Sequence, residues 1–280
     1  MKHIILTAAL LGAALAPATA QQDDAVTTGL EITEAEQAAA VQFAIENMRF
    51  ALLHEAGHLL LSEFEIPPSE QTEPVADRFA ALRLLAEPEG GVSALLASAD
   101  GWSWSAGEQT GGQADGAYLD VHNPDGERAK TLSCLMMGQS PAAFAASAAL
   151  FSLDATQQDR CTADFAGART AEDELFGLFR RGARPELTEA VDTRYEAGGA
   201  YQLIADALER GEVLETSARA VNAEFAFARP ITFVASVCDQ ENAFTDPEDG
   251  SVTLCYELAD AFVRLYVDNV LLGNRQPTSR

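Results

Sequence analysis

Two histidines four residues apart, inside a long run of helical periodicity, constrain the fold of this chain more than any other feature. Apolar residues recur at helical spacing across residues 40–64, and this stretch contains the motif His54-Glu55-Ala56-Gly57-His58. Residues four apart lie on one face of a helix, so both imidazoles can reach a single point in space. The chain is therefore expected to bury a long helix that presents two nitrogen ligands side by side.

Capping and breaking residues bound this helix and predict a second one. Thr33 followed by Glu36 is typical of a capping box, so we expect the first helix to begin there. The proline pair at 67–68 ends it. Pro74 suits the first turn of the next helix, which we expect to run to about Ala86.

The rest of the chain predicts a mainly helical α+β domain with a small β-hairpin or sheet. Residues 100–127 are rich in Gly, Asp, Asn and Ser and are expected to form a long loop. Residues 231–237 and 252–256 are β-branched and aromatic, and the turn-forming segment 246–250 between them predicts a hairpin. Further helices are expected around 141–152, 156–166 and 171–181, one or two between 186 and 228, and one at 259–272.

Residues 1–20 have the features of a signal peptide. A short polar start precedes the apolar residues 4–16, and the small-x-small sequence at 18–20 suits signal peptidase. The apolar run is too short for a permanent membrane span, so we expect no membrane anchor. Cleavage after Ala20 would release residues 21–280 as a single domain in the periplasm or outside the cell.

The composition is strongly acidic and argues against two classes of partner. The chain has 18 Lys and Arg against 43 Asp and Glu, a formal net charge of −25 at pH 7. Such a surface repels phosphate backbones and anionic lipids, so neither nucleic acid nor a membrane surface is expected to bind. Solubility accounts for the charge without any specific partner.

The four cysteines predict two disulfides. An even number of cysteines in an exported chain argues for a disulfide framework, although four cysteines allow three pairings. Cys134–Cys161 and Cys238–Cys255 are favoured because each closes a local loop. A metal site made of cysteines alone is disfavoured, since no Cys-x-x-Cys pair is present.

The His54/His58 pair predicts a zinc site with hydrolytic chemistry. Neutral imidazoles at this spacing suit Zn²⁺, which needs a third protein ligand and an open position for water when it is catalytic. Glu55 lies one step away from the ligand face and can act as a general base toward that water. Two histidines and a glutamate without a metal are costly to bury on so apolar a helix.

The motif and the acids that follow it resemble the thermolysin-type clan of zinc peptidases. A His-Glu-x-x-His helix is followed in that clan by Glu-x-x-x-Asp, which Glu73 and Asp77 match here. The resemblance implies that Glu73 is the third zinc ligand and that Asp77 holds the second nitrogen of His54. Pro74 disfavours helical dihedrals at Glu73, so the alternative that Asp77 is the ligand stays open.

A second resemblance, to a bacterial family of metallopeptidase-like domains of unknown function, covers about residues 40–260. It implies a zincin-like fold more than it implies a substrate, and Thr245 stands where that family is expected to have Tyr. The segments that carry the resemblance are Leu52 to His58, Glu73 to Asp77, Asp120 to Arg128, Cys134 to Cys161, Cys238 to Phe244 and Cys255 to Leu258.

Outside the motif, His122 is the best candidate for a further catalytic role. It lies in a polar segment, where an imidazole can donate a hydrogen bond to the oxyanion of a tetrahedral intermediate. A structural histidine, or less readily a zinc ligand, are the alternatives. Arg128 and Tyr256 are weaker candidates for the same role. Glu257 is interpreted as an ordinary acid at a helix N-terminus.

These residues predict hydrolysis of a peptide or protein substrate by a zinc-activated water with Glu55 as base. One alternative is a catalytically inactive zinc protein with a structural or interaction role, although such a site has no need of Glu55. Another is a zinc amidohydrolase that acts on a non-protein amide, such as one of the cell wall. The sequence does not indicate the cleavage preference or the oligomeric state.

Overall fold

A computed structural model of the chain describes residues 32–69, 72–87, 90–109, 125–144 and 153–273, with only the backbone at 106–109 and 125. The described residues from Thr33 onward belong to one compact unit. The predicted signal peptide at 1–20 and the candidate His122 lie outside the described residues.

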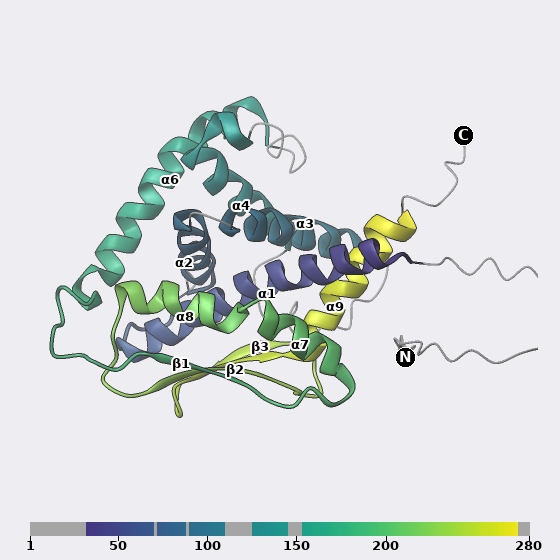
Figure 1. Cartoon of the computed structure of the whole chain (residues 1–280). Helices are drawn as coiled ribbons and strands as arrows, with labels where there is room; N and C mark the ends of the chain where they lie inside the picture. The colour runs from purple at the N-terminus through teal and green to yellow at the C-terminus, as the bar shows by residue number, and fades with distance from the viewer. Residues whose placement is uncertain (1–31, 70–71, 88–89, 110–124, 145–152, 274–280) are drawn as a thin grey trace, which may run out of the picture. The chain divides into compact units, whose positions relative to one another are not determined.

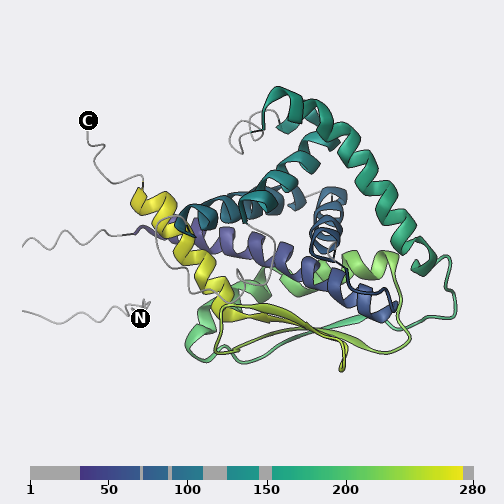
Figure 2. The ribbon, with the colours of Figure 1, turned by 180° about the vertical axis from the view of Figure 1, so that it is seen from behind.

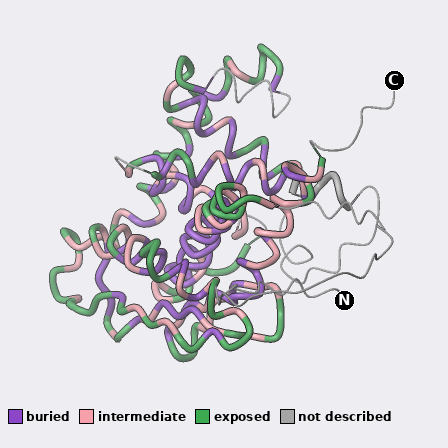
Figure 3. The backbone as a smooth tube through the Cα atoms, turned by 45° about the vertical axis from the view of Figure 1, so that its right-hand side comes forward, coloured by how far each residue is buried: buried purple, intermediate pink, exposed green. Residues whose placement is uncertain are grey.

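Helix α1, Glu34–Glu63, forms the centre of this unit and confirms the helix predicted from periodicity. The Thr33 hydroxyl accepts a hydrogen bond from the Glu36 N–H, and the Glu36 carboxylate accepts one from the Thr33 N–H, so the predicted capping box is present. One side of α1 faces a sheet, and the other side faces helices α2 (Thr72–Ala86) and α3 (Gly91–Gln109) (Figure 1). Covered on both sides, its second half is almost wholly buried (Figure 3).

Helix α2 begins two residues before its predicted start. Pro74 was expected to leave Glu73 outside the helix, but Glu73 belongs to the first turn of α2. A proline is tolerated there because the N–H groups of a first turn have no partner within the helix. Glu73 and Asp77 therefore lie four residues apart in one helix and share one of its faces.

The predicted loop at 100–127 is wrong at both ends. Helix α3 continues to Gln109, and another helix, α4 (Asp125–Gln139), already starts at Asp125. Gly101 is one of the residues that suggested a loop, but it lies in α3 where this helix crosses α1. A Cβ on Gly101 would come within 2.8 Å of the Asn47 side chain on α1. The glycine serves a close helix crossing, which local composition does not distinguish from a loop.

The two helices predicted around 156–166 and 171–181 are one helix, α6 (Ala155–Phe176), followed by a 3₁₀ turn at Gly177–Phe179. Asp154 begins α6 with a second capping box. Residues 141–144 are helical, as expected, and the rest of the helix predicted to 152 lies outside the described residues.

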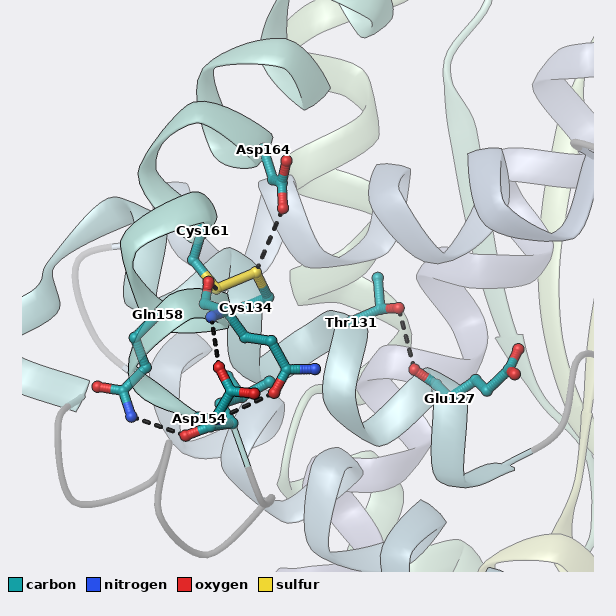
Figure 4. The surroundings of a disulfide bond; sticks show 9 residues. Glu127, Thr131, Cys134, Asp154, Gln158, Cys161 and Asp164 are labelled. Atoms are coloured by element: carbon teal, nitrogen blue, oxygen red, sulfur yellow. Dashed lines mark hydrogen bonds between the residues drawn. A yellow bond between two sulfur atoms is a disulfide. The ribbon is translucent and has the colours of Figure 1, made fainter.

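Both predicted disulfides are confirmed. Cys134 and Cys161 join α4 to α6 with 4.9 Å between their Cα atoms (Figure 4). The two helices approach closely because Gly138 has no Cβ, which would lie 2.2 Å from the Cys161 carbonyl oxygen. Cys238 and Cys255 are joined with 5.4 Å between their Cα atoms.

The C-terminal half contains a four-stranded sheet, seen from behind in Figure 2. Its spatial order is β1-β2-β4-β3, with β2 parallel to both β1 and β4, and β3 antiparallel to β4 at the edge. The strands are β1 (Val191–Tyr195), β2 (Ile231–Ser236), β3 (Ala243–Asp246) and β4 (Ser251–Cys255).

The hairpin predicted between residues 231–237 and 252–256 is wrong in its partners. These segments, β2 and β4, do pair, but in parallel. The hairpin is formed by β3 and β4, and its turn ends at Gly250, whose φ is +76°. Because the short β3 reverses the chain between the two longer strands, β2 and β4 point the same way.

Three helices complete the C-terminal half and support the sheet. The pair expected between residues 186 and 228 is present as α7 (Gln202–Arg210) and α8 (Val213–Glu224), but β1 precedes it and was not predicted. Helix α9 (Tyr256–Tyr266) starts three residues before its predicted start and continues as a π turn, Val267–Leu272. The predicted class, a mainly helical α+β fold with a small sheet, is confirmed.

No helix in the described ranges is long and apolar enough to cross a bilayer.

Candidate metal centre

The two motif histidines face each other on α1. Their Nε2 atoms are 3.0 Å apart, and their rings meet edge to face with centroids 4.7 Å apart. The His54 side chain is fully buried, whereas 18% of the His58 side chain is exposed. The pair therefore lies at the boundary of the interior, with His58 on the accessible side.

The Glu73 carboxylate, which α2 carries, completes a group of three possible metal ligands with the two histidines. One of its oxygens is 3.4 Å from His54 Nε2 and the other is 3.3 Å from His58 Nε2. Ligand atoms of all three residues lie within 4.8 Å of one another. Burial acts to raise the pKa of the Glu73 carboxyl, but hydrogen bonds and charge from the two histidines outweigh it and hold that pKa well below its ordinary value.

The helix crossing that brings Glu73 to the histidines depends on Gly57. A Cβ on Gly57 would lie 3.0 Å from the Ala76 Cα and 3.4 Å from the Phe79 Cβ of α2. The missing side chain, opposed by a small alanine, lets the two helices approach closely. Glu73 and Asp77 flank Ala76 on this face of α2, so the crossing directs both carboxylates toward His54.

Asp77 holds the far side of the His54 ring. Its Oδ1 atom is 2.8 Å from His54 Nδ1, and Asp77 is itself buried. Burial acts to raise the Asp77 pKa, but the charges of Arg128 and His54 hold it well below its usual range. An ionised Asp77 accepts the Nδ1–H, so the Nε2 lone pair of His54 is directed toward Glu73 and His58.

Arg128 on α4 forms an ion pair with Asp77. Its Nε donates to Asp77 Oδ2 at 3.0 Å and its Nη2 donates to Asp77 Oδ1 at 2.6 Å, which is a bidentate pair. The guanidinium also lies 3.9 Å from the centroid of the Trp102 ring. Arg128 was a weak sequence candidate for an oxyanion role, and its contacts include Asp77, the Trp102 ring and the His54 ring.

Glu55 is buried, with 4% of its surface exposed. A residue on the edge strand of the sheet binds it through hydrogen bonds. The Thr245 hydroxyl on β3 donates toward the Glu55 backbone oxygen at 2.8 Å and the Glu55 Oε2 at 3.1 Å. Sequence reasoning missed this role for Thr245. The two residues are 190 positions apart, and a threonine in a short strand carries no signal for such a contact.

The three-residue set fits a zinc ion. Bonds of about 2.0–2.1 Å in a tetrahedral zinc site place neighbouring ligand atoms roughly 3.3 Å apart. The Nε2 atoms of His54 and His58 are 3.0 Å apart, and each lies 3.3–3.4 Å from a different oxygen of the Glu73 carboxylate. Two imidazoles and one carboxylate are also a ligand set used by catalytic zinc sites. Asp77 lies on the opposite nitrogen of His54, which favours Glu73 as the third ligand.

Two other sequence candidates have structural contacts. Tyr256 is fully buried and its hydroxyl donates to the Glu196 carbonyl at 2.7 Å, while burial raises its pKa to about 12. Glu257 accepts hydrogen bonds from the backbone N–H groups of Cys238 and Asp239, so it holds the segment after β2. This agrees with the interpretation of Glu257 as a structural acid.

Comparison with known proteins gives a match to one family. The model of a family described as "Putative metallopeptidase" matches residues 18–176 and 196–277. No curated protein and no solved structure matches the chain. The family match covers both helices of the candidate centre and the strand that contacts Glu55. The chain therefore belongs to this metallopeptidase-like family.

Proposed function

We propose that the chain is a zinc-dependent peptidase of the His-Glu-x-x-His type. His54, His58 and Glu73 hold the metal, Asp77 orients His54, and Glu55 is the general base. The observation that carries the proposal is the convergence of three ligand atoms from α1 and α2 beside an almost buried glutamate. The Glu-x-x-x-Asp spacing on α2 further supports a thermolysin-type arrangement.

The proposed chemistry uses the chain's own residues around the metal. When bound, zinc lowers the pKa of a coordinated water and polarises the scissile carbonyl. The Glu55 carboxylate accepts a proton from the attacking water and later gives it to the departing amine nitrogen. The Asp77 carboxylate keeps the proton on His54 Nδ1, which leaves the Nε2 lone pair as the ligand. One peptide bond and one water become a carboxyl group and an amine.

The proposed setting is outside the cytoplasm. Two disulfides form and persist in oxidising compartments, and residues 1–20 have the pattern of a signal peptide. We therefore infer that the peptidase acts on peptides or proteins in the periplasm or beyond the cell.

The test measures metal and hydrolysis on the same preparations. Elemental analysis of wild type is expected to find about one zinc per chain, and a denatured protein substrate is expected to be cleaved. Glu55→Gln should retain zinc and stability while losing hydrolysis by ~10²–10⁴-fold, because it keeps the size of the side chain but removes the base. Glu174→Gln is the matched control, since Glu174 is exposed on α6.

Three results would contradict the proposal in different ways. A wild type that takes up no zinc, even after incubation with the metal, would remove the site itself. A wild type that holds zinc tightly but cleaves no peptide would favour a structural role, or an amide substrate that is not a peptide. Equal hydrolysis by Glu55→Gln and wild type would remove Glu55 as the base.

A further inference from the structure

Thr245, on the edge strand of the sheet, contacts Glu55, the proposed general base. Strand β3 packs against α1, and its Thr245 hydroxyl approaches both the backbone oxygen and the Oε2 atom of Glu55. A hydroxyl carries one proton, which here is shared between two acceptors of the same residue. Such a contact ties the end of the Glu55 side chain to its own main chain.

The position of Thr245 is determined by the sheet. Thr245 pairs with Val252 of β4, which is fully buried, whereas the preceding Phe244 pairs with Thr253. Phe244 and Thr253 line a groove on the other face of the sheet. Because neighbouring residues in a strand point to opposite faces, the register directs the Thr245 side chain toward α1.

A second contact holds the same hairpin to α1, two turns further along the helix. Arg229 donates to the Glu63 carboxylate at 2.5 Å and to the carbonyl oxygens of Pro247 and Glu248 in the β3–β4 turn. The turn is thereby held at the C-terminal end of α1, and Thr245 contacts the helix about two turns earlier, at Glu55. With strand and helix joined at two points, the hydroxyl donor has little freedom to move relative to Glu55.

We propose that Thr245 is a positioning residue, whose hydroxyl holds the Glu55 carboxylate in the orientation that proton transfer requires. This inference rests on the proposed function of Glu55. A glutamate side chain has several rotatable bonds, and a donor that binds one carboxylate oxygen restricts them before substrate arrives.

A purely structural role for Thr245 makes a different prediction. If the hydroxyl serves only the helix carbonyl, its loss affects stability and not the chemical step. Thr245→Val removes the hydroxyl at nearly constant shape, and Thr245→Ser retains it without the methyl group. Thr253→Val is the matched control, because it makes the same change in the same sheet on the face turned away from Glu55.

The experiment compares the zinc-loaded variants on an internally quenched peptide that wild type cleaves. Thr245→Val is expected to lower kcat by ~10–100-fold with KM and zinc content unchanged, and Thr245→Ser is expected to recover most of the loss. Thr253→Val should have the kcat of wild type. The melting temperature of Thr245→Val should fall by only about 2–4 °C, as for the loss of one hydrogen bond.

The inference is overturned if Thr245→Val keeps the wild-type kcat, or if the Ser and Val variants lose equal activity. A raised KM at constant kcat would also overturn it, because the strand would then act on substrate binding. If wild type cleaves nothing, the proposed function fails, and crystal structures of zinc-loaded wild type and Thr245→Val decide the positioning separately. A displaced Glu55 carboxylate in the valine variant supports the inference, and an unchanged one refutes it.

Discussion

Replacing Gly57 with Ala has two effects of opposite sign on the free energy of unfolding. Gly57 lies inside α1, where alanine is favoured over glycine by about 1 kcal/mol. The added methyl group, however, would lie 3.0 Å from the Ala76 Cα and 3.3 Å from the Ala76 Cβ. Backbone atoms cannot rotate away as a flexible side chain does, so α2 has to move, and overpacking of this kind costs ~1–3 kcal/mol. We expect Gly57→Ala to lower the free energy of unfolding by up to ~2 kcal/mol.

The larger consequence of Gly57→Ala is expected at the metal site. Glu73 and Asp77 are carried by α2, so a shift of that helix moves both carboxylates relative to the histidines. Zinc–ligand distances tolerate only about 0.2 Å, so we expect zinc affinity to fall by ~10–100-fold. Competition titration with a chelator measures the affinity. Denaturation of the metal-free protein measures stability without the contribution of bound zinc.

Gly167→Ala provides the control for helix propensity. Gly167 lies in α6, and a Cβ built there meets nothing within 4 Å. This variant should gain up to ~1 kcal/mol and melt about 2–4 °C higher, with zinc affinity unchanged. If Gly57→Ala gains as much stability as Gly167→Ala and keeps its zinc affinity, the close crossing of α1 and α2 does not set the geometry of the site.

Two further predictions concern the ligands and a disulfide. Glu73→Ala should weaken zinc binding more than Asp77→Asn does in chelator competition, because the first removes a proposed ligand and the second only the proposed orienting partner of His54. The reverse order would exchange the two proposed roles. Replacing Cys134 and Cys161 together by Ser should lower the free energy of unfolding by ~3–4 kcal/mol in urea denaturation, since their disulfide closes a loop of 27 residues. An unchanged denaturation midpoint would contradict this.

Features set by short-range sequence patterns were predictable here. The capping box at Thr33, the helix that carries the motif, and both disulfide pairings follow from residues close together in the chain. The proposed third ligand also lies within this range, since only 15 positions separate His58 from Glu73. The proposed zinc residues could therefore be named before the fold was known.

Features set by distant contacts were not predictable. The parallel pairing of β2 and β4 depends on the short β3 between them, and β1 is a strand of alternating burial inside a largely polar stretch. Gly101 marks a crossing with α1, but its surroundings have the composition of a loop. Thr245 contacts Glu55 across 190 positions, so only the assembled sheet identifies it.

The parts of the proposed site come from different stretches of the chain. This predicts the order in which they form during folding. The proposed ligand set lies between His54 and Glu73, on two consecutive helices. Short-range closure of this kind costs little entropy and is expected early in folding. Thr245 arrives only when the C-terminal sheet has formed. Under the proposed function, a chain whose sheet has not yet formed is thus expected to bind metal before Thr245 holds Glu55 in place.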